Sequence, residues 1–205
     1  MRTIAWRAGV LLAAAACRAS APAPAPPVAA DRPWTPTGAA TTTATAAQAA
    51  PTGAAADAAF MQSMIAHHAQ ALTMTALVPE RAARAELRPL AERIAVTQRD
   101  EIALMRRWLE RRGAPAATDH ASHAGHAMPG MLTDAELARL GAARGAAFDR
   151  LFLELMIRHH EGALAMVAEY FKTPGAGQEP EAFRLASDVD ADQRAEIRRM
   201  RALLP

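Results

Sequence analysis

A chain of 205 residues, 21% charged and only 4% aromatic, allows one folded domain with appendages. Its formal net charge of +2 falls to zero if residues 1–16 are removed, because the loss of Arg2 and Arg7 leaves 21 basic side chains against 21 acidic ones. This balance argues against a basic surface for nucleic acid, and the single cysteine excludes an internal disulfide or a cysteine metal cage.

The N-terminus has the features of an export signal. Two arginines precede an apolar run over residues 8–16, which is too short to cross a bilayer as a helix. Cys17 follows where a lipobox has its lipidated cysteine, with Ala14 at the position that leucine usually occupies. We expect residues 1–16 to be a cleaved signal peptide. The mature protein should then be exported to the periplasm or cell envelope, with a lipid on Cys17 as its only membrane attachment.

Residues 17–55 are dominated by alanine, proline and threonine, with APAPAPP at 21–27 and TTTATAA at 41–47. A stretch of this composition has little apolar surface to bury, so we predict a disordered, extended tether. The folded domain is then residues 56–205.

Four long helices are predicted in this domain. Apolar residues recur at helical spacing and are interrupted by proline and glycine, which gives helices at about 57–78, 87–112, 146–172 and 180–203. A capping-box pattern from Thr133 to Glu136 predicts a further short helix before the third long one. No strand pattern occurs. The predicted fold class is all-α, an antiparallel four-helix bundle with a loop at 113–132.

The sequence of the domain is duplicated, with one copy 92 positions after the other. The matching segments at this spacing are FMQSMIAHHAQALTM at 60–74 and FLELMIRHHEGALAM at 152–166. A second match, 95 positions apart, is QRDEIALM at 98–105 and QRAEIRRM at 193–200. Asp57 corresponds to Asp149 at the 92-residue spacing. We infer two duplicated helical hairpins related by a pseudo-twofold axis.

A helical wheel places a pair of histidines beside the centre of the buried face in each hairpin: His67 and His68, then His159 and His160. Counting outward from each turn sets Glu101 level with the first pair and Glu196 level with the second. Burying so many polar groups is costly unless they are paired. A histidine–glutamate hydrogen bond would pair them without a metal, and it would equally orient an imidazole toward one. Both interpretations stand at this point.

The loop between the second and third long helices contains DHASHAGHAMPGM at 119–131. Such a tract in an exported protein is typical of metal capture, and a flexible, solvated loop is the alternative. Thioethers select copper(I) and imidazoles also suit copper(II), so methionine and histidine without thiolate favour copper that changes oxidation state. The candidate ligands in this loop are His120, His123, His126, Met128 and Met131.

Two MIxHHxxAxxM segments, each followed by a QxxEIxxM helix, resemble the bacterial family named domain of unknown function 305 over nearly all of 57–205. The resemblance implies an exported protein with a ferritin-like four-helix fold, and some members are implicated in binding periplasmic copper. By position, the implied ligands in the bundle are Met64, His67, His68, Met74, Met156, His159, His160 and Met166. We expect four further residues to orient these ligands or add to them: Glu101, Met105, Glu196 and Met200. The copies differ at Ala69-Gln70, where the second has Glu161-Gly162.

The leading hypothesis is a non-enzymatic protein that sequesters, buffers or delivers copper, with metal ions and another envelope copper-handling protein as partners. A ferritin-like di-metal oxidoreductase is the first alternative. It lacks a glutamate three residues before either histidine pair, and Glu101 and Glu196 supply only two buried carboxylates. A haem bundle and a structural or interaction bundle without metal are further alternatives, the former without a CxxCH sequence.

Overall fold

The computed structural model describes residues 53–115 and 128–204. The chain forms helices α1 (Gly53–Thr75), α2 (Val78–Arg81), α3 (Leu87–Arg111), α4 (Asp134–Ala142), α5 (Gly145–Lys172) and α6 (Pro180–Arg201). Every regular element in these ranges is a helix, so the expected all-α fold is confirmed. The predicted signal peptide, Cys17, the tether up to residue 52 and the loop histidines His120, His123 and His126 lie outside the described residues.

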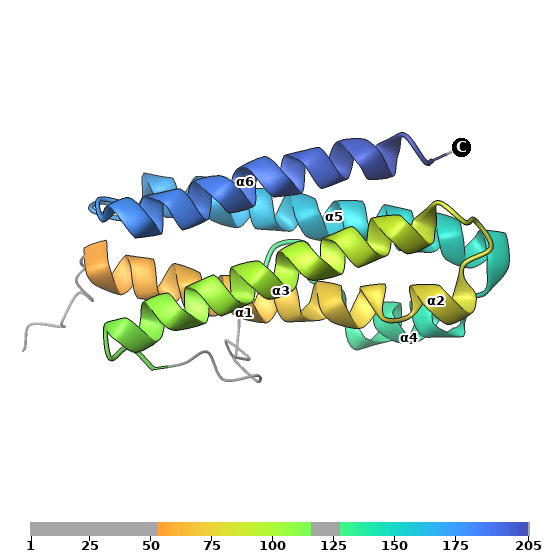
Figure 1. Ribbon diagram of the computed structural model, residues 1–205, viewed down its shortest axis with the longest axis horizontal. Helices are drawn as coiled ribbons and strands as arrows, with labels where there is room; N and C mark the ends of the chain where they lie inside the picture. The colour runs from red at the N-terminus through yellow and green to blue at the C-terminus, as the bar shows by residue number, and fades with distance from the viewer. Residues whose placement is uncertain (1–52, 116–127, 205) are drawn as a thin grey trace, which may run out of the picture. The chain divides into compact units, whose positions relative to one another are not determined.

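The four long helices form two hairpins, which Figure 1 shows packed against each other. α1 packs along α3 and α5 along α6, while α1 also contacts α5 and α3 contacts α6. Each long helix therefore borders two others, as in a four-helix bundle, and α4 packs on α5. In the part of the chain that the structure describes, no helix is both long and apolar enough to span a bilayer.

Local sequence accounts for the start of two helices. α4 begins with the predicted capping box, in which the Thr133 hydroxyl accepts the N–H of Glu136 and the Glu136 carboxylate accepts the N–H of Thr133. α6 begins with the carboxylate of Glu179, which accepts backbone N–H bonds of the first turn. Pro180 opens that turn, where a missing N–H carries no cost.

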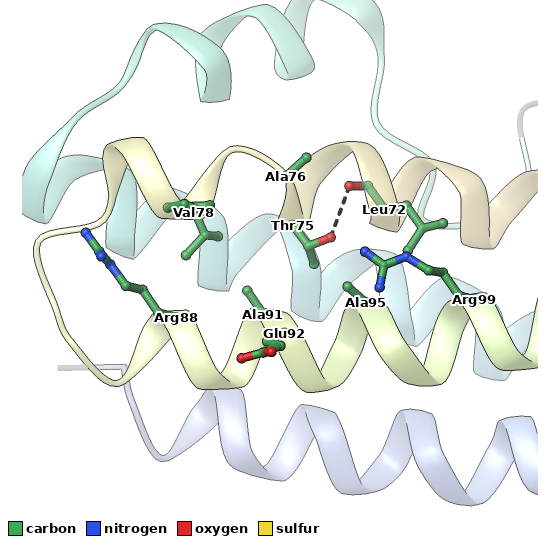
Figure 2. Close-up of a pocket in the computed structure, with 10 residues that line it drawn as sticks. Leu72, Thr75, Ala76, Val78, Arg88, Ala91, Glu92, Ala95 and Arg99 are labelled. Carbon is green, nitrogen blue, oxygen red and sulfur yellow. Dashed lines mark hydrogen bonds between the residues drawn. The ribbon is translucent and has the colours of Figure 1, made fainter.

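The first long helix differs from its predicted range of 57–78. α1 begins at Gly53 and ends at Thr75, and the short α2 follows after two residues. Pro79 explains this earlier end, because proline lacks the N–H that would bond the carbonyl four residues before it, at Thr75, and its ring clashes there. Within the last turn of α1 the Thr75 hydroxyl donates to the carbonyl of Leu72 at 3.0 Å, the dashed line in Figure 2.

A layer of buried polar residues crosses the middle of the hydrophobic core. One apolar cluster includes Met64 and Trp108, and a second includes Met74 and Phe152. On each long helix the residues between the two clusters are polar and buried: His67, His68, Gln98, Glu101, His159, His160, Gln193 and Glu196. Apolar packing on both sides therefore holds this polar layer in position.

Two buried aspartates tie each hairpin to the turn of the other. Asp57 on α1 accepts hydrogen bonds from the hydroxyl of Tyr170 (2.6 Å) and the N–H of Gly177 (2.8 Å), at the end of α5 and in the turn before α6. Asp149 on α5 accepts two successive backbone N–H groups in the turn between α2 and α3, at 3.0 and 2.9 Å. The repeated aspartate of the sequence thus holds the two hairpins together.

We expect Asp57→Ala to lower the free energy of unfolding by about 3 kcal/mol, because the hydroxyl of Tyr170 and the N–H of Gly177 lose their acceptor. Asp57→Asn should cost less, since the amide oxygen can still accept. Urea unfolding measures both, with Asp100→Ala on the exposed surface of α3 as the control. Equal stability of Asp57→Ala and the control would contradict this structural role.

Candidate metal centre

The polar layer brings all four predicted histidines of the bundle to one place. His67 on α1 and His159 on α5 have ring centroids 3.9 Å apart, with planes inclined by 37°. Within each pair the centroids are 6.5 Å apart for His67 and His68, and 6.1 Å apart for His159 and His160. All four side chains are buried. The two histidine pairs of the duplicated sequence therefore converge across the α1–α5 interface.

Each hairpin supplies one glutamate to its own histidine pair. The Oε2 atom of Glu101 lies 2.7 Å from Nε2 of His68, and Oε2 of Glu196 lies 2.7 Å from Nε2 of His160. The helix register predicted from the sequence set these residues level, and the contacts agree with it. A carboxylate on one ring nitrogen fixes the orientation of the imidazole and leaves the other nitrogen, here Nδ1, for a different partner.

A backbone carbonyl takes the place of the glutamate at His67. Nε2 of His67 lies 3.0 Å from the carbonyl oxygen of Pro129. Since a carbonyl only accepts, Nε2 carries the proton and Nδ1 is unprotonated in the neutral ring. Neither ring nitrogen of His159 makes a hydrogen bond within the described residues. The backbone of His67 lies near this ring and partly offsets the lowering of the His159 pKa.

Burial favours the neutral form of His67, His68 and His159. It lowers the pKa of His67 to about 3, with the neighbouring charge of His68 as the next cause. The pKa of His68 is also lowered to about 3, by burial and then by His160. The pKa of His159 is lowered well below its usual value, by burial and then by His67. Burial, with the carboxylates of Asp192 and Glu196, raises the pKa of Glu101 to about 8. At neutral pH the buried pair of Glu101 and His68 therefore carries no net charge.

The ring nitrogens that remain open fit a soft or borderline metal ion. Nδ1 of His67, His68 and His160 and both ring nitrogens of His159 lack a hydrogen-bond partner in the described ranges. Unpaired buried polar atoms are costly, and neutral imidazole is a ligand for copper, zinc and nickel. Over residues 53–115 and 128–204, however, no three His, Cys, Asp or Glu form a metal-binding group. A metal site here therefore needs other donors, such as thioethers, besides the imidazoles.

The predicted methionine ligands lie at different distances from this layer. Four are fully buried one helical turn from a histidine or glutamate of the layer: Met64, Met105, Met156 and Met200. Met74 is buried seven residues after His67, about 10 Å along the helix axis, and Met166 is partly exposed. The first four are thus nearer the histidines than the last two, and a role as ligand stays a prediction for all six.

Residues of the long loop also reach the polar layer. Met128 and Met131, two of the predicted loop ligands, are partly exposed and flank the Pro129 that contacts His67. Sequence reasoning missed Pro129, together with Gln70 and Gly162, which hold this segment. The difference between the copies at Ala69-Gln70 and Glu161-Gly162 was the signal that could have found them.

Two buried glutamines complete the layer on the α3–α6 side. Arg112 and Glu179 form an ion pair at 3.0 Å between these helices, and Gln98 and Gln193 each lie fourteen residues along their helix from it. This antiparallel register sets the two glutamines opposite each other. Both amide groups are buried without a hydrogen-bond partner in the described residues.

Replacing both glutamines with methionine should raise the free energy of unfolding by about 1–2 kcal/mol, because two unpaired buried amides become apolar groups of similar size. Each single substitution should give about half of this gain. Thermal and urea unfolding of the Gln98→Met/Gln193→Met double variant measure the effect. A loss of stability would instead mean that the amides hold a buried water or ion in solution.

The fold and its sequence are shared with known proteins. The family model described as domain of unknown function, DUF305, matches residues 57–204. A DUF305 fragment from Deinococcus radiodurans is 37% identical, with 75% of this chain and 97% of that chain covered and a TM-score of 0.66. A putative secreted DUF305 protein from Streptomyces coelicolor is 34% identical, with 71% and 88% covered and a TM-score of 0.62.

Structures of CopM with copper bound are also similar. The Cu(I)-bound form is 28% identical, with 71% of this chain and 93% of that chain covered and a TM-score of 0.59. The Cu(II)-bound form is 30% identical over the same shares, with a TM-score of 0.60. No curated protein matches the chain. Copper is therefore bound in a protein of similar fold that is 28–30% identical to this chain.

Proposed function

The chain belongs to the DUF305 family, and from that premise we propose that it is a copper-binding protein of the cell envelope, which buffers, sequesters or delivers copper. The observation that carries this proposal is the buried layer of four histidines with open ring nitrogens, placed between methionines on both sides. The copper-bound forms of the similar protein CopM add support. We propose a binding role without catalysis.

The residues present suit copper in both oxidation states. His67 and His159 would supply imidazole nitrogens. His68 and His160 would supply two more, and Glu101 and Glu196 orient these two rings. Met64 and Met156 would supply thioethers, which favour copper(I). Bound copper would bring one-electron redox chemistry, while the protein's own side chains bind the ion and exclude water from it.

The proposed place of the protein in the cell rests on its N-terminal sequence. Arg2, Arg7, the apolar run and Cys17 favour export and a lipid anchor. One of the similar structures is titled a putative secreted protein. We propose an exported protein on a lipid-anchored tether, which exchanges copper with another envelope protein.

The di-metal oxidoreductase gains little support from the carboxylates. The buried ones in the described ranges are Asp57, Glu101, Asp149 and Glu196. Asp57 and Asp149 are committed to backbone and tyrosine donors at the ends of the bundle. Only two carboxylates remain in the central layer, fewer than a typical di-iron site uses.

Isothermal titration of the mature protein, made without a His-tag, with copper(I) and copper(II) tests the proposal. We expect binding tighter than about micromolar for at least one of the two ions. Weaker binding of both ions would refute copper binding as the function. Oxygen consumption by the iron- or copper-loaded protein would favour the oxidoreductase instead.

A further inference from the structure

Residues 128–132, here called the strap, lie across α1 and α5 beside the polar layer. Gln70 on α1 holds one end, because its side chain donates to the carbonyl of Leu132 (3.0 Å) and accepts the N–H of Leu132 (2.7 Å). At the other end the carbonyl of Pro129 accepts from Nε2 of His67 at 3.0 Å. The strap is therefore attached to α1 at two points, Pro129 and Leu132.

The contact of the strap with α5 depends on glycine. A Cβ atom added to Gly162 would lie 2.1 Å from the carbonyl oxygen of Pro129 and 2.6 Å from Cα of Gly130. Gly130 itself has a φ of +75°, and a Cβ there would lie 2.6 Å from the carbonyl oxygen of Arg158. Only a helix without a side chain at position 162 lets Pro129 approach this closely.

This arrangement explains where the two copies of the repeat differ. Position 70 in the first copy corresponds to position 162 in the second. The first copy has glutamine there, which bonds the strap, and the second has glycine, which makes room for it. One strap thus crosses two equivalent helices, and the two equivalent positions serve it in different ways.

Three of the four histidines contact an oxygen atom through the same ring nitrogen, Nε2. Nε2 of His68 meets Glu101, Nε2 of His160 meets Glu196, and Nε2 of His67 meets the carbonyl of Pro129. In each case Nδ1 remains without a partner. Histidine ligands of metals commonly donate the other ring N–H to a carboxylate or backbone carbonyl, which sets the tautomer and the ring orientation.

We propose that the strap is a positioning element, in which Gln70 and Gly162 hold the carbonyl of Pro129 so that His67 offers Nδ1 to a soft metal ion. This role rests on the copper-binding function proposed above. Pro129 does for His67 what Glu101 does for His68, but through a segment that the duplication does not repeat. The strap therefore makes the two equivalent hairpins unequal at the metal centre.

Gly162→Ala tests this role, because the added methyl group displaces Pro129 without changing any histidine. In long-range ¹H–¹⁵N spectra of the metal-free wild type, His67 should be a single tautomer with the proton on Nε2. In Gly162→Ala this signature should become a mixture, and the affinity for copper(I) in competition with a chelator should fall about tenfold. Gly141→Ala on α4, where an added Cβ meets nothing within 4 Å, is the matched control and should change neither quantity.

Gln70→Ala removes the bonds between α1 and Leu132 of the strap. Like Gly162→Ala, it should give a mixture of His67 tautomers and a lower affinity for copper(I). Gln70→Glu keeps an acceptor for the N–H of Leu132 and should restore part of the affinity. An unchanged tautomer in both Gly162→Ala and Gln70→Ala, or an altered tautomer with unchanged affinity, overturns the proposal. Failure of the wild type to bind copper(I) would refute the proposed function instead, and the tautomer spectra, recorded without metal, separate the two outcomes.

Discussion

Replacing His67, His68, His159 and His160 together with alanine is expected to abolish the rise in melting temperature that copper produces in the wild-type protein. A ligand that binds only the native state stabilises it by about 2.7 kcal/mol at 100 times its Kd. For a domain of this size, that corresponds to roughly 5–10 °C. The substitutions remove every open imidazole nitrogen of the central layer, so the shift should fall to zero. Scanning calorimetry with and without copper(I) measures it.

The matched variant carries His120→Ala, His123→Ala and His126→Ala in the loop. It should bind fewer copper ions but keep most of the thermal shift, because the four buried histidines of the bundle are unchanged in this variant. The melting temperature of each metal-free variant is the baseline, since alanine in the core leaves a cavity. If the loop variant loses the whole shift, the bundle histidines are core residues only and the assignment of the metal centre is wrong.

The metal-free protein should lose stability steeply below pH 6.5. The pKa of His67 is lowered to about 3 in the folded state, and that of His159 is lowered well below 6.5. The unfolded chain therefore binds protons that the folded chain does not, and this stability is fully present above pH 6.5 and is lost as the pH falls toward 3. At pH 5 the shift of His67 should cost about 2 kcal/mol, and that of His159 should act in the same direction. Urea unfolding between pH 4.5 and 7 measures the slope.

Glu101 should act in the opposite direction at higher pH. Its pKa is raised to about 8, so the folded protein keeps a proton that the unfolded chain has lost above pH 4.5. The stability that this proton contributes is present at low pH and disappears as the pH rises through 8. Glu101→Gln should flatten the decline between pH 6.5 and 8, and His67→Leu/His159→Leu should flatten the acid limb. A stability that is constant from pH 5 to 8 would contradict both shifts.

Contacts within a hairpin were predictable because a short turn fixes the register of two antiparallel helices. Counting from the turns set Glu101 level with the pair His67 and His68, and Glu196 level with the pair His159 and His160. The structure shows that His68 and His160 make the two hydrogen bonds. The capping box at Thr133 was equally local and is confirmed. The end of α1 at Thr75 was misplaced by three residues, because Pro79 acts on the carbonyl four residues before it.

By itself the sequence determined an all-α fold of two duplicated hairpins, the buried face of each helix and the pairing of each glutamate with a histidine. Only the tertiary structure decided that the rings of His67 and His159 lie side by side, that Asp57 and Asp149 hold the turn of the opposite hairpin, and that Pro129 bonds His67. These contacts join parts of the chain that a long loop or a whole hairpin separates. A connection of that length fixes neither the offset between α1 and α5 nor the path of the strap, so side-chain packing across the interface sets both.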